Sequence, residues 1–382
     1  MNRQLVGRRL ARASAAALVT ALAAANLLAA PAALASAGPP VATTGPPGAS
    51  GQAPIGGAQL AGHGVIVNYP ARHARHLPYV AASAYLIADA GTGQVLAAKD
   101  PHGWFRPAST LKVLTAITLM PVLAPDATVV ASHRAAVAVP SKVGLIQGDS
   151  YQIADLFKAL LMISANDAAV ALAQATGSYA RGIAMMNAEA HHLQADDTVA
   201  VTPNGLDADG QHSSAYDEAL FARQALDIPE FMDDEQLRTV RFPVKPHHKP
   251  VTLYTQNTML DTYPGDLGGK IGWTTRDETT FIGWARRRHT TLVVTILHCT
   301  PLTELTYAAR LLNWGFAMDG KVTPVGELVS PLPAAPPPAQ HHPEAALPLA
   351  AGLAALLVAV LTTVLAVLVS RRARRAGNPA GQ

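Results

Sequence analysis

Apolar residues between positions 77 and 320 follow two different periods, and the period predicts the type of each element. Residues 82–90 and 94–98 are short apolar runs separated by Gly91-Thr92-Gly93, which predicts a β-hairpin. Apolar side chains at helical spacing then predict helices over 109–120, 156–163, 167–176, 179–191 and 214–225. Strands follow over 268–273, 280–284 and 291–298, with a charged turn at 286–289, and a helix over 303–316 closes the unit.

The order strands, helices, strands, helix predicts the fold class. Pairing of the first and last strands in one antiparallel sheet brings distant parts of the chain together, with helices on the faces of the sheet. We therefore expect an α/β (α+β) fold, an antiparallel sheet flanked by helices plus a helical region. A cleft is expected between the sheet and the helical region.

The first 37 residues have the composition of a targeting segment. A basic start containing Arg3 and Arg12 precedes an apolar stretch over 13–30, and small residues at 33–37 form cleavage patterns. This order predicts a secretory signal peptide over 1–37. The Arg8-Arg9 pair leaves a twin-arginine export route open as an alternative.

The other end of the chain predicts a membrane anchor. Residues 347–369 contain no charge and are long enough as a helix to cross about 30 Å of hydrocarbon. Four arginines follow within 371–375, which predicts a basic cytoplasmic tail over 370–382 and an extracytoplasmic folded domain over 77–320. A buried core helix is the alternative for 347–369.

Composition narrows the remaining possibilities. Residues 38–76 are rich in Gly, Pro and Ala and residues 321–346 are rich in Pro, so both are predicted to be linkers. The net charge of +3 arises largely from arginines near the two ends, which argues against nucleic acid as a partner. The single cysteine, Cys299, excludes an internal disulfide and is predicted to be a buried, inert thiol. No His, Cys, Asp or Glu residues have metal-ligand spacing, so we expect no metal and no cofactor.

The first candidate for chemistry is Ser109-Thr110-Leu111-Lys112. Positions three apart share one face of a helix, so the Ser109 hydroxyl and the Lys112 amine can meet. Backbone N–H groups at the helix start favour developing negative charge. A lysine shielded from water loses its proton more readily and can then act as a base toward the serine. In isolation, a helix cap with a solvated lysine explains the same residues.

Two further segments carry polar groups at positions suited to a binding cleft. Ser164-Ala165-Asn166 interrupts an apolar helical region, and it offers a hydroxyl for proton transfer and an amide for substrate; a plain helix cap is the alternative. Gly268 to Thr274 is a candidate strand whose glycines admit a bound peptide, while Lys270 supplies a positive charge for a carboxylate. A plain edge strand is the alternative for this segment.

Together and in this order, the three segments match the signature set of penicillin-binding proteins and class A β-lactamases. The chain more specifically resembles low-molecular-mass penicillin-binding proteins of the serine-type D-alanyl-D-alanine carboxypeptidase family over about 81–320. The residues that carry this resemblance are 100–103, 106–112, 164–169, 202–207 and 214–217.

The resemblance implies a transpeptidase fold and an acyl-enzyme on Ser109, with Lys112 as general base. It also implies that Ser164 and Asn166 assist proton transfer and substrate orientation, and that Lys270 binds the terminal carboxylate of a peptidoglycan stem peptide. Gly272, Trp273 and Thr274 complete the implied substrate-binding strand, and the backbone N–H groups of Ser109 and Trp273 form the implied oxyanion site. β-Lactam antibiotics are the expected covalent inhibitors.

One departure from the family puts activity in doubt. Ile271 stands where the family has Thr or Ser, and the loss of that hydrogen bond to a carboxylate costs about 1.5–3 kcal/mol. A catalytically impaired wall-binding module is therefore an alternative. A class A β-lactamase is another, although none of Glu189, Glu218, Glu230 and Glu235 has a clear claim to activate the deacylating water. In place of the family's β-rich C-terminal domain, we expect the predicted linker and membrane helix.

Overall fold

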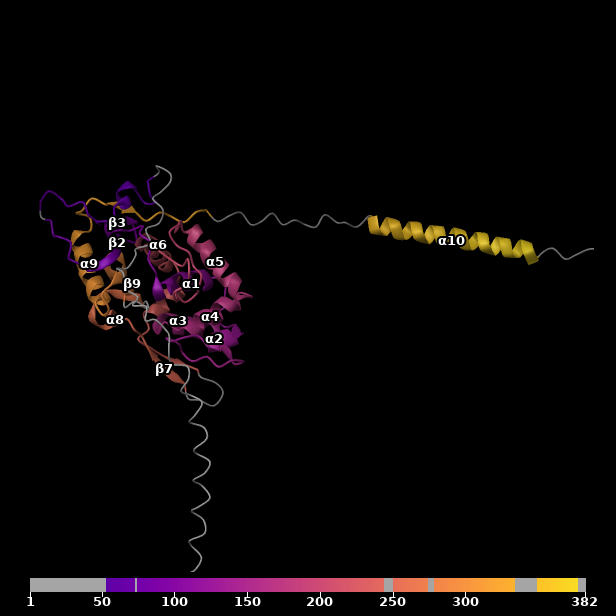
Figure 1. The fold of residues 1–382 in the computed structure, drawn as a ribbon, viewed down its shortest axis with the longest axis horizontal. Helices are drawn as coiled ribbons and strands as arrows, with labels where there is room; N and C mark the ends of the chain where they lie inside the picture. The colour runs from indigo at the N-terminus through magenta and orange to yellow at the C-terminus, as the bar shows by residue number, and fades with distance from the viewer. Residues whose placement is uncertain (1–52, 73, 244–249, 274–277, 334–348, 377–382) are drawn as a thin grey trace, which may run out of the picture. The chain divides into compact units, whose positions relative to one another are not determined.

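The computed structural model describes residues 53–72, 74–243, 250–273, 278–333 and 349–376 (Figure 1). The predicted signal peptide over 1–37 lies outside these residues. The described chain contains one large sheet, a helical region that includes two small two-stranded sheets, and helices on both faces of the large sheet.

Seven strands form the large sheet within the described residues, and all of its pairs are antiparallel. Strand β10 (Thr290–Cys299) pairs with β2 (Ala82–Asp89) on one side and with β9 (Thr279–Arg287) on the other. The predicted pairing of the first and last strands is thus confirmed. Beyond them lie β3 (Gln94–Lys99) next to β2 and β8 (Asp266–Trp273) next to β9. Strand β8 is therefore an edge strand.

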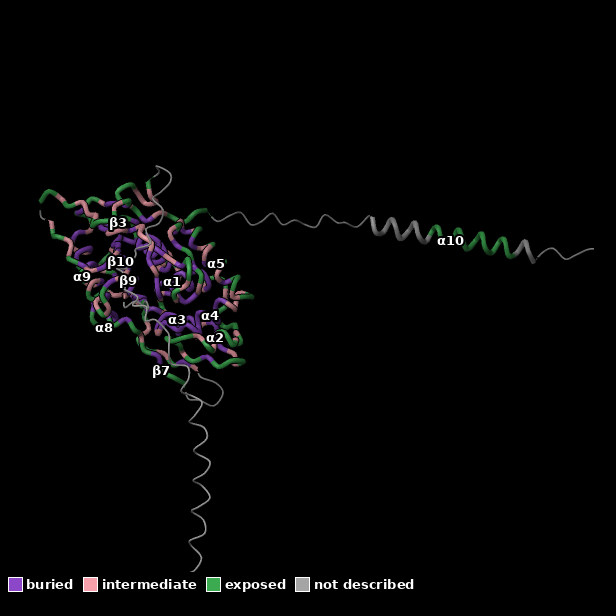
Figure 2. The backbone as a smooth tube through the Cα atoms, in the orientation of Figure 1, coloured by how far each residue is buried: buried purple, intermediate pink, exposed green. Residues whose placement is uncertain are grey.

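Alternation along the strands directs apolar side chains to two separate cores. Ala84, Leu86 and Ala88 of β2 belong to one buried cluster, whereas Tyr85 and Ile87 belong to the other. The first cluster lies under helices α1 (Leu111–Leu119), α3 (Ile153–Met162), α4 (Asn166–Ala175), α5 (Tyr179–His192) and α6 (Ala215–Ala225), and the second lies under α9 (Glu304–Met318). Figure 1 shows α9 on one side of the strands and α1, α5 and α6 on the other, and Figure 2 shows the buried residues between these layers. Because both faces of the sheet are covered, its central strands are apolar almost throughout.

The long helices have bounds close to those that periodicity predicts. They are α1 (Leu111–Leu119), α3 (Ile153–Met162), α4 (Asn166–Ala175), α5 (Tyr179–His192), α6 (Ala215–Ala225) and α9 (Glu304–Met318). Shorter elements were not predicted: α2 (His133–Ala136), α7 (Pro229–Glu235), α8 (Met259–Thr262), and two small two-stranded sheets, which pair β4 (Thr128–Val130) with β5 (Ser150–Gln152) and β6 (Thr239–Phe242) with β7 (Val251–Tyr254).

The folded unit is longer at both ends than the predicted 77–320. In the predicted linker 38–76, a 3₁₀ helix (η1, Ala58–Ala61) buries Leu60 and β1 (Val65–Ile66) pairs with β3. In the predicted linker 321–346, β11 (Gly326–Glu327) also pairs with β3, and Val325 and Leu328 are buried. The described parts of these two segments are therefore not extended tethers, because their few apolar side chains complete the core beside β3.

The C-terminal segment forms helix α10 (Leu349–Ala376). Among the residues whose placement is described, no helix has the length and apolar character needed to cross a membrane. The predicted transmembrane helix over 347–369 is therefore not supported by the structure.

Candidate active site

Ser109 lies on a tight turn that leads from Pro107 into helix α1. The turn is a short 3₁₀ helix (η2, Ala108–Thr110), and Ala108 has a positive φ of 50°, which is unfavourable for a residue with a side chain. Gly205 allows the next segment to pass close by, because a Cβ at that position would lie 1.7 Å from the carbonyl oxygen of Ala108. The result is a half-buried serine held at the start of a buried helix.

Lys112 lies one helical turn after Ser109 and is fully buried. Its Nζ is 2.8 Å from the Oγ of Ser109, 2.8 Å from the Oδ1 of Asn166 and 2.7 Å from the carbonyl oxygen of Asn204. Burial, together with the charge of Lys270, lowers the pKa of Lys112 well below its usual value, against the opposing charge of Asp167.

These three contacts match the bonding capacity of an uncharged amine. The Oδ1 of Asn166 and the carbonyl of Asn204 are acceptors only, so each takes one N–H of Lys112. A neutral amine has only two N–H groups, and its lone pair is then left for the hydroxyl proton of Ser109. The arrangement can therefore draw a proton from Ser109 and make its oxygen nucleophilic.

The second predicted segment lies at the junction between α3 and α4. Ser164 has a positive φ of 60° and is only 5% exposed, and within the described residues its hydroxyl has no hydrogen-bond partner. Asn166 begins α4, where its Nδ2 donates to the carbonyls of Val139 (3.0 Å) and Pro140 (3.2 Å). The amide of Asn166 thus joins Lys112 to the loop at 139–140, which the sequence did not suggest.

The third predicted segment is the edge strand β8, which lies beside the Ser109 turn. A Cβ on Gly272 would be only 2.8 Å from the backbone nitrogen of Ser109 and 2.1 Å from the Oγ1 of Thr280. Only a glycine lets the strand approach the turn this closely. The structure therefore places strand β8 directly beside the Ser109 turn.

Lys270 of β8 is almost fully buried, and its Nζ donates to the carbonyl oxygen of Ile271 at 2.7 Å. Burial lowers the pKa of Lys270 to about 8, and the charge of Glu235 opposes this shift. Glu235 lies behind the strand, where its Oε2 accepts the N–H of Gly269 at 2.9 Å. Its own pKa is raised to about 7 by burial, against the charge of Lys270. Lys270 is therefore a buried cation with an acidic neighbour.

The remaining predicted residues of β8 have different surroundings. Trp273 is 66% exposed at the end of the strand, so its indole is open to a ligand. Ile271 packs against the second core, the one beneath α9. Thr274, and Thr275 beside it, lie outside the described residues.

Asp167 is a functional neighbour that sequence reasoning missed. Its two oxygens accept the N–H groups of Val143, Gly144, Leu145 and Ala168 at 2.7–3.1 Å. It therefore fixes the loop that follows residues 139–140 and holds a negative charge below the site. The position of Asp167 directly after Asn166 was the feature of the sequence that could have indicated this role. Asn204 was also missed as a partner of Lys112, because a backbone carbonyl leaves no mark in the sequence.

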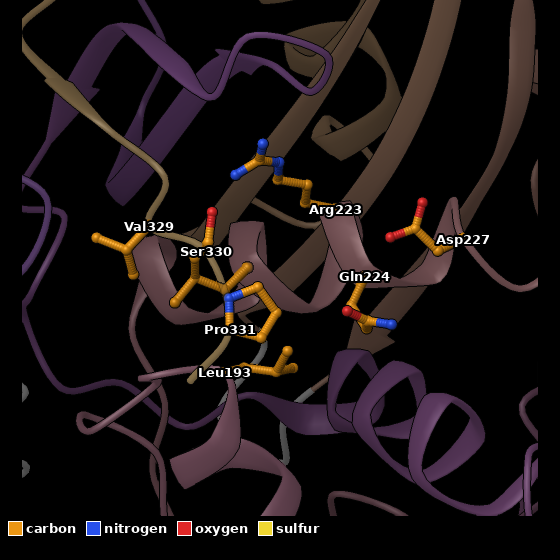
Figure 3. Close-up of a pocket in the computed structure, with 8 residues that line it drawn as sticks. Leu193, Arg223, Gln224, Asp227, Val329, Ser330 and Pro331 are labelled. Atoms are coloured by element: carbon orange, nitrogen blue, oxygen red, sulfur yellow. The ribbon is translucent and has the colours of Figure 1, made fainter. Parts of the chain in front are cut away.

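Other features of the described residues lie apart from this chemistry. A pocket of about 240 Å³ is lined mainly by the end of α6 and residues 329–331 (Figure 3). None of its lining residues belongs to the Ser109 cluster, which consists of Ser109, Lys112, Ser164, Asn166 and Lys270. Its Arg223 already donates to the carbonyls of Ala90 and Leu328. Cys299 is buried, and burial raises the pKa of its thiol, as expected for an inert cysteine. No group of three or more His, Cys, Asp or Glu residues in the described chain is placed to hold a metal ion.

Comparison with known proteins gives the same family as the motifs. The D-alanyl-D-alanine carboxypeptidase family matches residues 71–300. The carboxypeptidase DacB2 of Mycobacterium tuberculosis is 36% identical over 258 residues, which cover 66% of this chain and 88% of the relative. DacC of Escherichia coli is 29% identical over 265 residues, which cover 65% of this chain and 64% of DacC.

Solved structures of related enzymes have the same fold as this chain. A D-alanyl-D-alanine carboxypeptidase from M. tuberculosis superposes with a TM-score of 0.63 and 34% identity, covering 69% of this chain and 99% of that one. A mutant of the Streptomyces K15 DD-transpeptidase gives a TM-score of 0.60 with 27% identity, covering 63% and 99%. The mixed α/β fold predicted from the sequence is thus the penicillin-binding-protein fold, and the chain belongs to the D-alanyl-D-alanine carboxypeptidase family of serine peptidases.

Proposed function

We propose that Ser109 is the nucleophile with which this carboxypeptidase removes the terminal D-alanine of peptidoglycan stem peptides, and that Lys112 is its general base. The observation that carries the proposal is the set of contacts around the Nζ of Lys112. Two neutral acceptors, on Asn166 and Asn204, take its N–H groups and leave its lone pair toward Ser109. The family supports the reaction, and this geometry supports the choice of Ser109 and Lys112.

The proposed reaction has two steps. The Oγ of Ser109 attacks the carbonyl carbon of the penultimate D-alanine while Lys112 takes the hydroxyl proton. The proton passes to the leaving amine, assisted by Ser164, and free D-alanine departs. Water then attacks the ester by the reverse proton path and releases the shortened peptide and Ser109. The backbone N–H groups of Ser109 and Trp273 are proposed to stabilise the oxyanion in both steps.

Substrate recognition is assigned to strand β8 and the α3–α4 junction. Lys270 pairs with the terminal carboxylate, and Asn166 orients the substrate backbone. Gly272 lets the peptide lie against the strand, with Thr274 at its end. β-Lactams are proposed to acylate Ser109, because their strained amide resembles the D-Ala-D-Ala bond.

The site is better suited to a carboxypeptidase than to a β-lactamase. A β-lactamase needs a carboxylate that activates water beside the acyl-enzyme. Glu235 contacts the backbone of β8, and Glu218 contacts Thr110. Glu189 and Glu230 show no contact with the Ser109 cluster among the described residues, and no specific observation favours the second function.

Products from a defined pentapeptide test the proposal. Mass spectrometry should detect release of one D-alanine by the wild type and none by Ser109→Ala. Fluorescent penicillin should label the wild type stably and leave Ser109→Ala unlabelled. Rapid penicillin turnover would favour a β-lactamase, and neither labelling nor D-alanine release would favour a binding module in which Ile271 has impaired catalysis. The muropeptide products also separate carboxypeptidase from endopeptidase or transpeptidase action.

The substrate class places the proposed action outside the cytoplasm. Export by residues 1–37 stays a prediction from the sequence, because these residues lie outside the described part of the chain. Attachment by a single membrane-spanning helix is not part of the proposal, since no described helix qualifies as a span.

A further inference from the structure

Glu218 is a buried carboxyl group next to the nucleophile turn for which the proposed reaction has no use. It lies on α6 and is fully buried. Its Oε1 is 2.5 Å from the Oγ1 of Thr110, the residue after Ser109. Within the described residues its Oε2 has no hydrogen-bond partner. An ionised carboxylate left with one unpaired, buried oxygen is a costly arrangement.

The hydrogen bonds of Thr110 fix the position of one proton. Its Oγ1 lies 2.5 Å from the Oε1 of Glu218 and also 2.5 Å from the carbonyl oxygen of Pro107. A hydroxyl has one hydrogen, so it donates one short bond and must accept the other. A carbonyl oxygen has no proton to give. Thr110 therefore donates to Pro107 and accepts from Glu218, which requires a proton on the Glu218 carboxyl group.

Burial also favours the protonated form of Glu218. It raises the pKa of Glu218 well above its usual value, the Thr110 bond opposes this rise, and the charge of Asp217 on the same helix adds to it. A neutral acid also explains the second oxygen, because a carbonyl oxygen without a partner costs far less than a carboxylate oxygen.

The chain of bonds that starts at Glu218 ends at the turn that carries the nucleophile. The carbonyl of Pro107 also accepts the hydroxyl of Thr280 from β9 at 2.8 Å. The turn is thus fixed from α6 through Thr110 and from the sheet through Thr280. It includes Ala108, whose positive φ needs support from its surroundings.

We propose that Glu218 is a positioning residue that, as a neutral carboxylic acid, donates through Thr110 to hold the Ser109 turn in its reactive conformation. This inference rests on the proposed role of Ser109 as nucleophile. Glu218 bonds Thr110 and does not contact the Ser109 oxygen, so it takes no part in proton transfer to the substrate.

Two substitutions at Glu218 compare an uncharged hydrogen-bond donor with a side chain of similar length that cannot donate. Glu218→Gln keeps the shape and an N–H donor without a charge, whereas Glu218→Met keeps only the approximate length. The rate of acylation by fluorescent penicillin should fall by roughly tenfold or more in Glu218→Met, because a small misplacement of a reacting atom is costly, and by less than about threefold in Glu218→Gln. An equal loss in both variants would overturn the proposal.

A double-mutant comparison tests the route through Thr110. Thr110→Val, which keeps shape and removes the hydroxyl, should slow acylation about as much as Glu218→Met, and the double variant should be no slower than either. Thr110→Ser should retain most of the rate. Additive losses would show that the two residues act separately and would contradict the inference.

An infrared difference spectrum detects the proton on Glu218 directly. This measurement requires neither enzyme activity nor a correctly folded Glu218→Met variant. The wild type should show a carboxylic-acid C=O band at neutral pH that is missing from Glu218→Gln. Glu189→Gln, a matched change on α5, should retain this band. A wild type without it would refute the neutral acid even if Ser109 is the nucleophile. If Ser109→Ala were still acylated, the proposed function would fail while the band remained.

Discussion

Replacing Asn166 with aspartate tests whether Lys112 works as an uncharged base. The two side chains have the same shape, and the Oδ1 of residue 166 stays 2.8 Å from the Nζ of Lys112. The substitution adds a negative charge at the atom that the amine already contacts. An opposite charge at this distance favours the ammonium form of Lys112, which has no lone pair for the Ser109 hydroxyl.

The size of the effect follows from the distance. Two unit charges 2.8 Å apart attract by roughly 6 kcal/mol at an effective dielectric constant of about 20, which equals about four pKa units for Lys112. The new carboxylate is itself desolvated, and this cost cancels part of the gain. We therefore expect a net rise of about two units in the pKa of Lys112 and an acylation rate at pH 7 that is lower by up to roughly 100-fold.

The pH dependence of acylation distinguishes a protonated base from a damaged site. Fluorescent penicillin labelling between pH 6 and 10 should show that Asn166→Asp recovers about tenfold per pH unit, as the amine loses its proton. Asn187→Asp is the matched control, because the amide of Asn187 also bonds backbone groups but does not contact Lys112. It should keep the wild-type pH profile.

Two results would refute the reasoning. One is a wild-type rate in Asn166→Asp at pH 7, which would mean that the charge state of Lys112 does not limit acylation. The other is a uniform loss at every pH, since this would assign the effect to the lost donor bonds to Val139 and Pro140 instead. Melting temperatures of both variants show whether the fold is intact.

Three further predictions follow from the described contacts. Asp167→Asn should lower the free energy of unfolding by about 3 kcal/mol in calorimetry, because its carboxylate accepts the N–H groups of residues 143–145. Gly272→Ala should slow penicillin acylation roughly 100-fold with an unchanged circular dichroism spectrum, because the new Cβ would lie 2.1 Å from the Thr280 hydroxyl. The proposed binding of a carboxylate by Lys270 requires the ammonium form, which predominates below its pKa of about 8 and is lost above it, so KM for the peptide should rise above pH 8 in steady-state kinetics. A KM that is flat to pH 10 would argue against this role.

The parts of the site that were predicted from sequence are those set by local geometry. Ser109 and Lys112 meet because they are one helical turn apart, and this spacing is visible in the sequence. The hairpin of β2 and β3 was equally visible, since apolar runs flank a glycine-containing turn. That Asn166 and Lys270 lie near Lys112 came only from the family resemblance, because no local pattern specifies contacts between distant segments.

The parts that were missed have no periodic signal. Strand β1 has only two residues, and η1 buries only Leu60. Elements this short leave no periodic pattern, so the Gly- and Pro-rich composition of residues 38–76 predicted a linker instead. The positive φ of Ala108 and Ser164 was also not predictable, because neither residue type favours that conformation. Both lie in the site, where close packing against the neighbouring segments maintains the strain.

The site contains two buried lysines whose surroundings separate their roles. Lys112 bonds only neutral groups, and the charge of Lys270 lowers its pKa further. Asp167 opposes this, but both of its oxygens already accept backbone N–H groups and none of its bonds goes to Lys112. Burial lowers the pKa of Lys270, whereas the charge of Glu235 raises it and so favours the ammonium form of Lys270.

Two ammonium groups in one water-poor site repel each other, so protonation of Lys270 promotes loss of the proton from Lys112. A bound carboxylate would strengthen the charge on Lys270, so the substrate would couple the proposed base, Lys112, to the proposed carboxylate-binding group, Lys270.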